Sequence, residues 1–505
     1  MDCSVMEKIE SAVAWTAFGV TAIIVLLSPW CFGAWEAWWF WPFTGLVFIA
    51  TSIFGTQLLL RATHHERHTV SGRSQVRANG DRRRRRMVQT ASRKPLRIIC
   101  LATSLLFLCY ATMRFLRAPV FVDAQRSLLL FVAPFLLGLQ IVYGFNSQRR
   151  FLLHRMILFN LLLLGLYGIL NHSITGSSLV LWRPGFSQYF GADRASGSYF
   201  CPDHYAGIME IALCMALGIV CARDSTWRWR LAGVLVSIVS VTGVIMSKSR
   251  GGGMTVVVIL AAACVWGVAQ YPPRRRWAMR SIAVAVLVAG LLGITLTGNA
   301  YITRFATWFG WEQSQDRPLS EMTRVVWKRV QRSSRWNMSS GALRAWRESK
   351  LKGIGPGMHQ TIWPHVAASP DGDVESGQWP SRLNNQRYSY EVHNDWIQLL
   401  EEYGIIGFAL LLAAVVAMGG SLLSSIRSAV GQRACGAPSR TTGSQFALVT
   451  GALLSLLALA FHSLGDFNLQ LPATGWLFGV ILATGLEAAT RRDTRGPQAY
   501  CEVNA

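Results

Sequence analysis

Residues suited to anion binding gather in SKSRGGG, residues 247–253, where one apolar run ends and the next begins. Arg250 precedes three glycines there. Glycines let the backbone approach a ligand closely, and a helix that starts at this point presents free N–H groups and the positive end of its dipole. A guanidinium beside them favours phosphate or carboxylate groups. The stretch predicts an anion site, and the competing interpretation is an arginine that caps a tight glycine turn.

More cations follow in SSRWNMSSGALRAWRES, residues 333–349, which carries Arg335, Arg344 and Arg347. The string GIGPG at 353–357 comes shortly after. Closely spaced glycines can cradle a phosphate, but no strand–helix unit surrounds these, so a plain turn is the favoured interpretation. The segment therefore contributes positive charge rather than a phosphate loop.

A candidate general base lies in YEVHNDWIQLLEEYGIIG, residues 390–407. The spacing of its polar and apolar positions predicts an amphipathic helix that Asn394 or Asp395 caps. His393 stands directly before this cap. Histidine is the usual general base in proteins, which suits a residue that takes a proton from a hydroxyl group. A boundary histidine with a structural hydrogen bond is the alternative.

A further polar patch, RASGSYFCPDHYAGIME, covers residues 194–210 and enters an apolar run. Arg194 and Asp203 lie near the start of the run, and Glu210 lies further inside it. An acidic group within a membrane span is costly and needs a partner. We expect that partner to be an arginine at the same end of the span.

The last patch, FHSLGDFNLQLP at residues 461–472, offers His462 and Asp466 between two apolar runs. Both residue types can do acid–base chemistry. For this pair we favour structural hydrogen bonds over catalysis.

The sequence predicts no metal or cofactor site. Asp371 and Asp373 form a D-x-D pair in a polar loop, a short pattern that arises easily by chance. The ten cysteines form no C-x-x-C pair. Walker A, H-E-x-x-H and G-x-S-x-G motifs are also missing, so the sequence gives no support to an ATPase, a zinc protease or an α/β-hydrolase.

The polar patches lie between apolar runs that are long enough to cross a bilayer, so membrane spans must hold the patches in place. Half of the 505 residues are hydrophobic (51%) and only 15% are charged, a composition that excludes soluble, disordered and disulfide-scaffold proteins. Spanning segments must be helical, because lipid offers no partner for free backbone groups. We therefore predict an all-α, polytopic membrane protein. About twelve spans are expected, at 11–30, 38–60, 98–116, 127–145, 151–170, 205–222, 231–247, 251–269, 281–297, 396–420, 446–464 and 472–489.

The distribution of lysine and arginine predicts the orientation of these spans. With the N-terminus in the cytoplasm, 29 of the 49 basic residues lie on the inner side and seven in short outer connections. This is the bias that the positive-inside rule describes. Both termini are then cytoplasmic, and the polar patches lie in or beside loops that open on the outer face, at 171–204, 247–252, 299–395 and 462–471. The run Arg82–Arg86 and the net charge of +23 indicate topology and contact with membrane lipids rather than nucleic acid.

This pattern divides the chain into five segments. They are 1–170, with spans one to five and the basic cytoplasmic loop 61–97; 171–298, with spans six to nine; 299–395, a long outer loop; 396–489, with the last three spans; and 490–505, a cytoplasmic tail.

Taken in order, four stretches resemble the O-antigen ligase/polymerase superfamily of bacterial envelope glycosyltransferases. They are RASGSYFCPDHYAG, SKSRGGG, SRWNMSSGALRAW with GIGPG, and VHNDWIQLLEEYGIIGF. The closing HSLGDFNLQLP is also similar to a pattern of many members, so the resemblance spans roughly residues 190–475. Members often have asparagine where this chain has Asp203, and the segment 358–391 is longer here than in many of them.

The resemblance implies a C-type glycosyltransferase fold in a bacterial inner membrane. It implies transfer of a glycan from an undecaprenyl-diphosphate carrier to a lipid, glycan or protein acceptor on the periplasmic face, without a metal ion. By match to the family's motifs, Arg250 and Arg335 bind the diphosphate, and His393 activates or orients the acceptor hydroxyl. Arginines suit this role because negative charge develops on the leaving diphosphate. The remaining expected substrate-binding residues are Arg194, Arg344, Asn394 and Asp395.

Two alternatives stay open. A polysaccharide polymerase or a protein O-oligosaccharyltransferase of the same superfamily would share these motifs. A transporter or flippase is an alternative of a different class. Transporters commonly show internal repeats and polar residues near the middle of the membrane. No internal repeat is visible here, and the polar residues collect at one face, so glycosyl transfer is favoured.

Overall fold

The structure is a computed structural model that describes residues 3–71, 94–176, 194–222, 225–270, 319–331, 333–367, 389–434 and 443–490, together with the single positions 284 and 288. Every regular element within these residues is a helix. Ten helices are long and apolar enough to cross a membrane. They are α1 (Cys3–Leu27), α2 (Ala37–Ser71), α4 (Lys94–Phe115), α5 (Phe121–Leu139) continued by η3 (Gln140–Gly144), α6 (Ser147–Thr175), α7 (Pro202–Cys221), α8 (Trp227–Met246), α15 (Asp395–Ala434), α16 (Gly443–His462) and α17 (Pro472–Thr490).

Six further elements are described. They are η1 (Phe32–Ala34), α9 (Arg250–Gln270), α12 (Leu319–Gln331), α13 (Ser334–Glu348), α14 (His359–Val366) and η7 (Asn468–Gln470). Ten of the predicted spans each fall on one of the ten long helices, and the span at 251–269 falls on α9. The span at 281–297 lies outside the described residues, apart from positions 284 and 288. The prediction of an all-helical polytopic membrane protein is confirmed, whereas its division into five segments stays a prediction.

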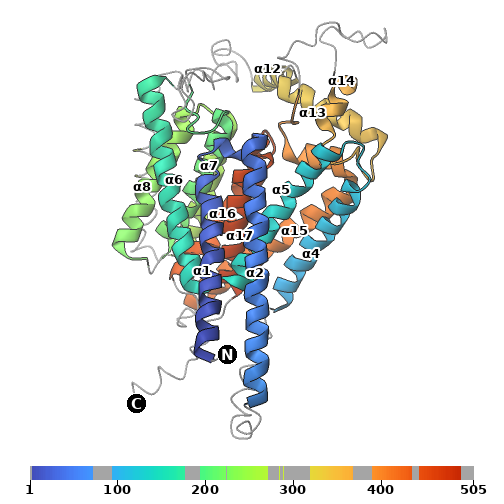
Figure 1. Cartoon of the computed structure of the whole chain (residues 1–505). Coiled ribbons are helices and arrows are strands. Elements are labelled where there is room, and N and C mark those ends of the chain that lie inside the picture. Colours follow the sequence, from blue (N-terminus) through green and yellow to red (C-terminus); the bar gives the residue numbers. More distant parts are fainter. Residues whose placement is uncertain are drawn as a thin grey trace.

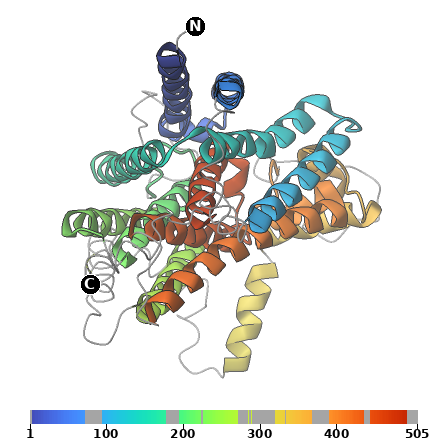
Figure 2. The same cartoon turned by 90° about the horizontal axis from the view of Figure 1, so that it is seen from below.

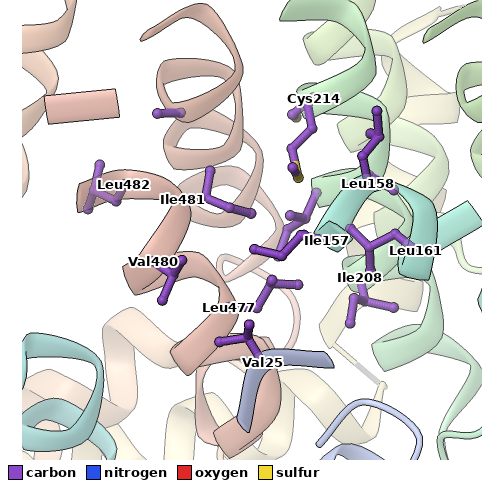
Figure 3. Packing of buried hydrophobic residues seen from close by; sticks show 14 of the residues in the cluster. Val25, Ile157, Leu158, Leu161, Ile208, Cys214, Leu477, Val480, Ile481 and Leu482 are labelled. Atoms are coloured by element: carbon purple, nitrogen blue, oxygen red, sulfur yellow. The ribbon is translucent and has the colours of Figure 1, made fainter. Parts of the chain in front are cut away.

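Helix α7 forms the centre of the molecule. All of its residues are buried, and it packs against α8, α9 and α16. Glycines permit the closest approach: a Cβ atom at Gly218 would lie 2.4 Å from the carbonyl oxygen of Ala447 on α16. Small residues bring membrane helices together in this way. Side chains of α1, α6, α7 and α17 fill the remaining space, among them Leu161, Ile208 and Leu477 (Figure 3).

The helices alternate in direction and so bring the polar patches to one end of the molecule. At the opposite end, Glu487 pairs with Arg97 and Arg150, and Glu10 pairs with Arg61. Helices α12, α13 and α14 gather at the end that carries the patches (Figure 1). Seen along the helices, α16 and α17 lie near the middle, whereas α1 and α2 lie at the rim (Figure 2). We call the end with the patches the site end. The run Arg82–Arg86 lies outside the described residues.

Candidate active site

Asp466 lies at the middle of the site end, in the turn between α16 and α17, and is fully buried. Its Oδ1 atom accepts hydrogen bonds from Nδ1 of His393 (3.2 Å) and from the backbone N–H of Phe467 (3.0 Å). Its Oδ2 atom lies 3.4 Å from Nη2 of Arg335. Burial alone would raise the pKa of this carboxyl group, but Arg335 and the hydrogen bond from His393 hold the pKa well below its usual range. Asp466 is therefore ionised and acts as an acceptor.

His393 takes its orientation from Asp466. An ionised carboxylate only accepts hydrogen bonds, so Nδ1 carries the proton and Nε2 is the basic nitrogen of the neutral ring. The ring packs edge-on against Phe467, with centroids 4.5 Å apart, and 28% of the side chain is exposed. Its backbone φ is +56°, a conformation that costs a non-glycine residue energy and that often marks functional positions. The arrangement is that of an accessible general base with a fixed tautomer.

Asn394 and Asp395 hold the turn that carries Asp466. Asn394 caps α15 by accepting from the N–H of Ile397 (3.0 Å), and its amide donates to the carbonyl of Leu464 (2.8 Å). This confirms the predicted cap. Asp395 accepts from the hydroxyl of Ser463 at 2.6 Å. Both side chains thus bond to residues around the turn between α16 and α17, and both support the position of Asp466.

Two arginines share one carboxylate beside Asp466. Asp203, in the first turn of α7, accepts from Nη2 of Arg194 at 2.7 Å and from Nη2 of Arg335 at 3.0 Å. The structure thus brings together two predicted anion ligands that are 141 positions apart in the sequence. Arg335 is 39% exposed and Arg194 is buried, so Arg335 offers the accessible positive charge.

Arg344 is not part of the cluster formed by Arg194, Asp203, Arg335, His393 and Asp466. It lies nine residues after Arg335 on α13, which is about two and a half helical turns, so the two side chains leave the helix on opposite faces. The guanidinium of Arg344 donates to the carbonyl of Val366 at the end of α14. It therefore joins α13 to α14.

Arg250 is the first residue of α9, and the glycines after it face the buried side of the cluster. A Cβ atom at Gly251 would lie 3.0 Å from Nε2 of His462. One at Gly252 would lie 2.9 Å from Cβ of Ala206 and 3.2 Å from Oε1 of Glu210. These glycines are needed where α9 packs against α7 and α16. Close helix packing therefore explains Gly251 and Gly252 without a bound anion.

Glu210 pairs with a histidine, and the prediction of an arginine partner is wrong. Its Oε1 atom lies 2.8 Å from Nδ1 of His462, and Nε2 of His462 lies 3.9 Å from Asp466. Both ring nitrogens thus lie within 4 Å of a carboxylate. An arginine on another helix was the obvious partner from sequence, because a histidine 252 positions away gives no local signal.

The GIGPG string forms a turn that packs on α15. The N–H groups of Ile354 and Gly355 donate to the carbonyls of Glu401 and Glu402 at 2.9 and 3.1 Å. Gly357 donates to the side chain of Glu402 at 2.8 Å. The prediction of a plain turn is confirmed, because these N–H groups bind the protein.

The sequence favours structural hydrogen bonds for Asp466, and the structure shows Asp466 accepting hydrogen bonds from His393 and Phe467. The sequence assigns no role to Asp203, which binds Arg194 and Arg335 in the structure. The i, i+4 spacing of His462 and Asp466 at a span end was an available signal. Asp371 and Asp373 lie outside the described residues, and within the residues that are described, no group of three or more His, Cys, Asp or Glu side chains is arranged to hold a metal ion.

An elongated cavity of about 320 Å³ lies next to the cluster, between α4, α5, α15 and α17. Its walls are mostly apolar, with Phe131 and Leu411 among the lining residues. Asp395 and Ser463, which hold the turn before Asp466, line one end, and Arg97 and Glu487 line the other. The cavity therefore runs from the site end toward the opposite end of the bundle, where Arg97 pairs with Glu487.

Comparison with known families gives one match. Residues 235–412 match the family described as O-antigen ligase. The matched segment includes Arg250, Arg335 and His393 but ends before Asp466. No curated protein matches the chain.

Proposed function

Because this chain carries an O-antigen ligase domain over residues 235–412, we propose that it transfers a glycan from a polyprenyl-diphosphate carrier to an acceptor hydroxyl group. The observation that supports this most directly is the His393–Asp466 pair beside the guanidinium of Arg335. It combines a base with positive charge at one end of a membrane-spanning bundle. We propose that this end faces the periplasm, in line with the distribution of basic residues.

In the proposed reaction, Nε2 of His393 takes the proton of the acceptor hydroxyl while its oxygen attacks the anomeric carbon. The bond between that carbon and the diphosphate breaks, and the diphosphate leaves with the electron pair. Asp466 stabilises the imidazolium that forms. Attack opposite the leaving group inverts the anomeric centre. Asp203 and Asp466 bind arginine and histidine side chains, and they are not arranged as the pair of carboxyl groups that a double displacement uses.

Arginines stabilise the leaving diphosphate in this proposal. Arg335 and Arg194 supply guanidiniums that converge on Asp203. We propose that Arg250, the first residue of α9, adds a third. A fixed positive charge at a boundary of low dielectric stabilises developing negative charge strongly. No metal ion is assigned a role.

The test is glycan transfer by the purified full chain, with lipid-diphosphate-linked glycan as donor and envelope lipid, glycan and protein fractions as acceptors. We expect His393→Ala and Arg335→Ala to lower transfer by about 10²-fold or more. Arg347→Ala, on the exposed side of the same helix as Arg335, is the matched control and should stay near wild type. Movement of the donor across vesicles without transfer would instead support a flippase.

The apolar cavity is proposed to hold the isoprenoid tail of the donor. Gly138 lines it, and a Cβ atom there meets only Cβ of Ala483, at 3.5 Å. Gly138→Phe should lower transfer from an undecaprenyl-length donor by about tenfold. The added ring would displace part of the tail, and excluding only two of its CH₂ groups from the cavity would weaken donor binding by that factor. A donor with a three-isoprene tail should be nearly unaffected. Gly45→Phe, on an open face of α2, is the control, and an equal loss with both tails would place the tail elsewhere.

A further inference from the structure

Asp203 uses both of its oxygens to bind arginines. Oδ1 accepts from Arg194 at 2.7 Å and Oδ2 accepts from Arg335 at 3.0 Å. The carboxylate is 12% exposed, so little water competes for it. Charge-assisted bonds of this kind are short and strong.

Each of these arginines is also held by a backbone carbonyl. Nε of Arg194 donates to Ser247 at 2.8 Å, and Nη1 of Arg335 donates to Gly465 at 2.6 Å. The carbonyls fix one arm of each guanidinium, and the other arms converge on Asp203. Two guanidiniums that converge on an anion between them form the arrangement that also binds phosphate oxygens.

The charges in this group are balanced before any substrate binds. Arg194 and Arg335 contribute two positive charges, and Asp203 and Asp466 contribute two negative charges within 3.4 Å of them. An arriving diphosphate therefore meets guanidiniums that already have an anionic partner. Since like charges in one poorly hydrated site repel strongly, Asp203 and the diphosphate oppose each other.

We propose that Asp203 is a built-in counter-ion, which holds Arg194 and Arg335 together in the free enzyme and competes with the carrier diphosphate for them. The inference depends on the proposed function, since it takes a diphosphate as the ligand. This competition would assist release of the product. The carrier diphosphate leaves with one more negative charge than the donor had, and Asp203 then binds the two arginines in place of the diphosphate. Asparagine at this position carries no charge and has one acceptor oxygen, so it would no longer hold both arginines through separate oxygens.

The experiment compares wild type with Asp203→Asn in detergent, using undecaprenyl diphosphate and farnesyl diphosphate as probes in a binding titration. We expect the variant to bind both at least about tenfold more tightly. Without ligand, the variant should melt at a lower temperature than wild type. Its melting temperature should rise more than that of wild type when diphosphate is added. In steady-state transfer, KM for the donor and kcat should both fall, because product release slows.

Three further variants test whether the charge of Asp203 causes the effect. Asp203→Ser removes the charge with a smaller side chain and must agree with Asp203→Asn. Asp203→Glu restores the charge and should bring affinity back toward wild type. Asp123→Asn, the same change in the first turn of α5 at the site end, should leave diphosphate affinity unchanged.

A folded Asp203→Asn protein with equal or weaker diphosphate affinity would overturn the counter-ion role and leave Asp203 as a structural link only. Wild type that binds neither diphosphate and transfers no glycan would overturn the proposed function as well. The two failures are thus distinguished by the wild-type titration.

Discussion

Replacing Asp466 with asparagine is expected to lower glycan transfer by about 10²- to 10³-fold at pH 7. The amide has nearly the same shape as the carboxylate but can present its NH₂ group to Nδ1 of His393. The ring would then carry its proton on Nε2, the atom that must accept the acceptor's proton. Arg335 would also lose a charged partner at 3.4 Å. The measurement is the initial rate of transfer at saturating donor, with expression and melting temperature matched to wild type.

Two comparisons separate this effect from general damage to the turn. Ser463→Ala removes the 2.6 Å hydrogen bond to Asp395, so it loosens the turn without altering the His393 pair. It should lower the melting temperature more than it lowers the rate. If Asp466→Asn and Ser463→Ala lost the same activity at the same loss of stability, Asp466 would be a structural residue only.

The low pKa of Asp466 also fixes a dependence of stability on pH. The folded state holds this pKa well below its usual range, whereas in the unfolded chain it returns to about 3.9. The ionised carboxylate therefore stabilises the fold fully above about pH 4, and this contribution is lost as the pH falls further, toward the folded-state pKa. Wild type should exceed Asp466→Asn in melting temperature at pH 7, and the difference should shrink below pH 4. A constant difference over that range would contradict the assignment.

The sequence was sufficient to predict features that depend on local patterns. Apolar runs located the membrane helices, because any span must satisfy its own backbone. The cap of α15 by Asn394 followed from its position before an amphipathic run. The prediction that Arg194 and Arg335 share a site followed from the resemblance to the ligase/polymerase superfamily, and the structure shows them on one carboxylate.

Pairings between distant segments could not be predicted in the same way. His393 and Asp466 are 73 positions apart, and no periodicity links them. Arg344 illustrates a missed local rule: segment 333–349 was read as a loop, so the nine-residue spacing from Arg335 was not recognised as opposite faces of one helix. The glycines after Arg250 were ambiguous, since close approach to a ligand and close approach to a helix need the same residue.

Glu210→Gln is expected to destabilise the protein by about 3–5 kcal/mol, the usual result of removing one partner from a buried ion pair. Glu210 is fully buried on α7, and His462 lies 2.8 Å away on α16. Glutamine fills the same volume, so the loss would come from charge rather than from a cavity. The neighbouring helix α9 leaves no room for relaxation, since a Cβ atom at Gly252 would lie 3.2 Å from Oε1 of Glu210.

The double variant Glu210→Gln/His462→Gln tests whether the pair is the cause. Two amides can hydrogen-bond to each other without a buried charge, so the double variant should be more stable than Glu210→Gln alone by more than about 1 kcal/mol. Reversible unfolding in detergent mixtures gives the free energies. Additive losses would show that α7 and α16 depend on each residue separately. Recovery in the double variant would mean that the charge pair itself joins the two central helices beneath Asp466.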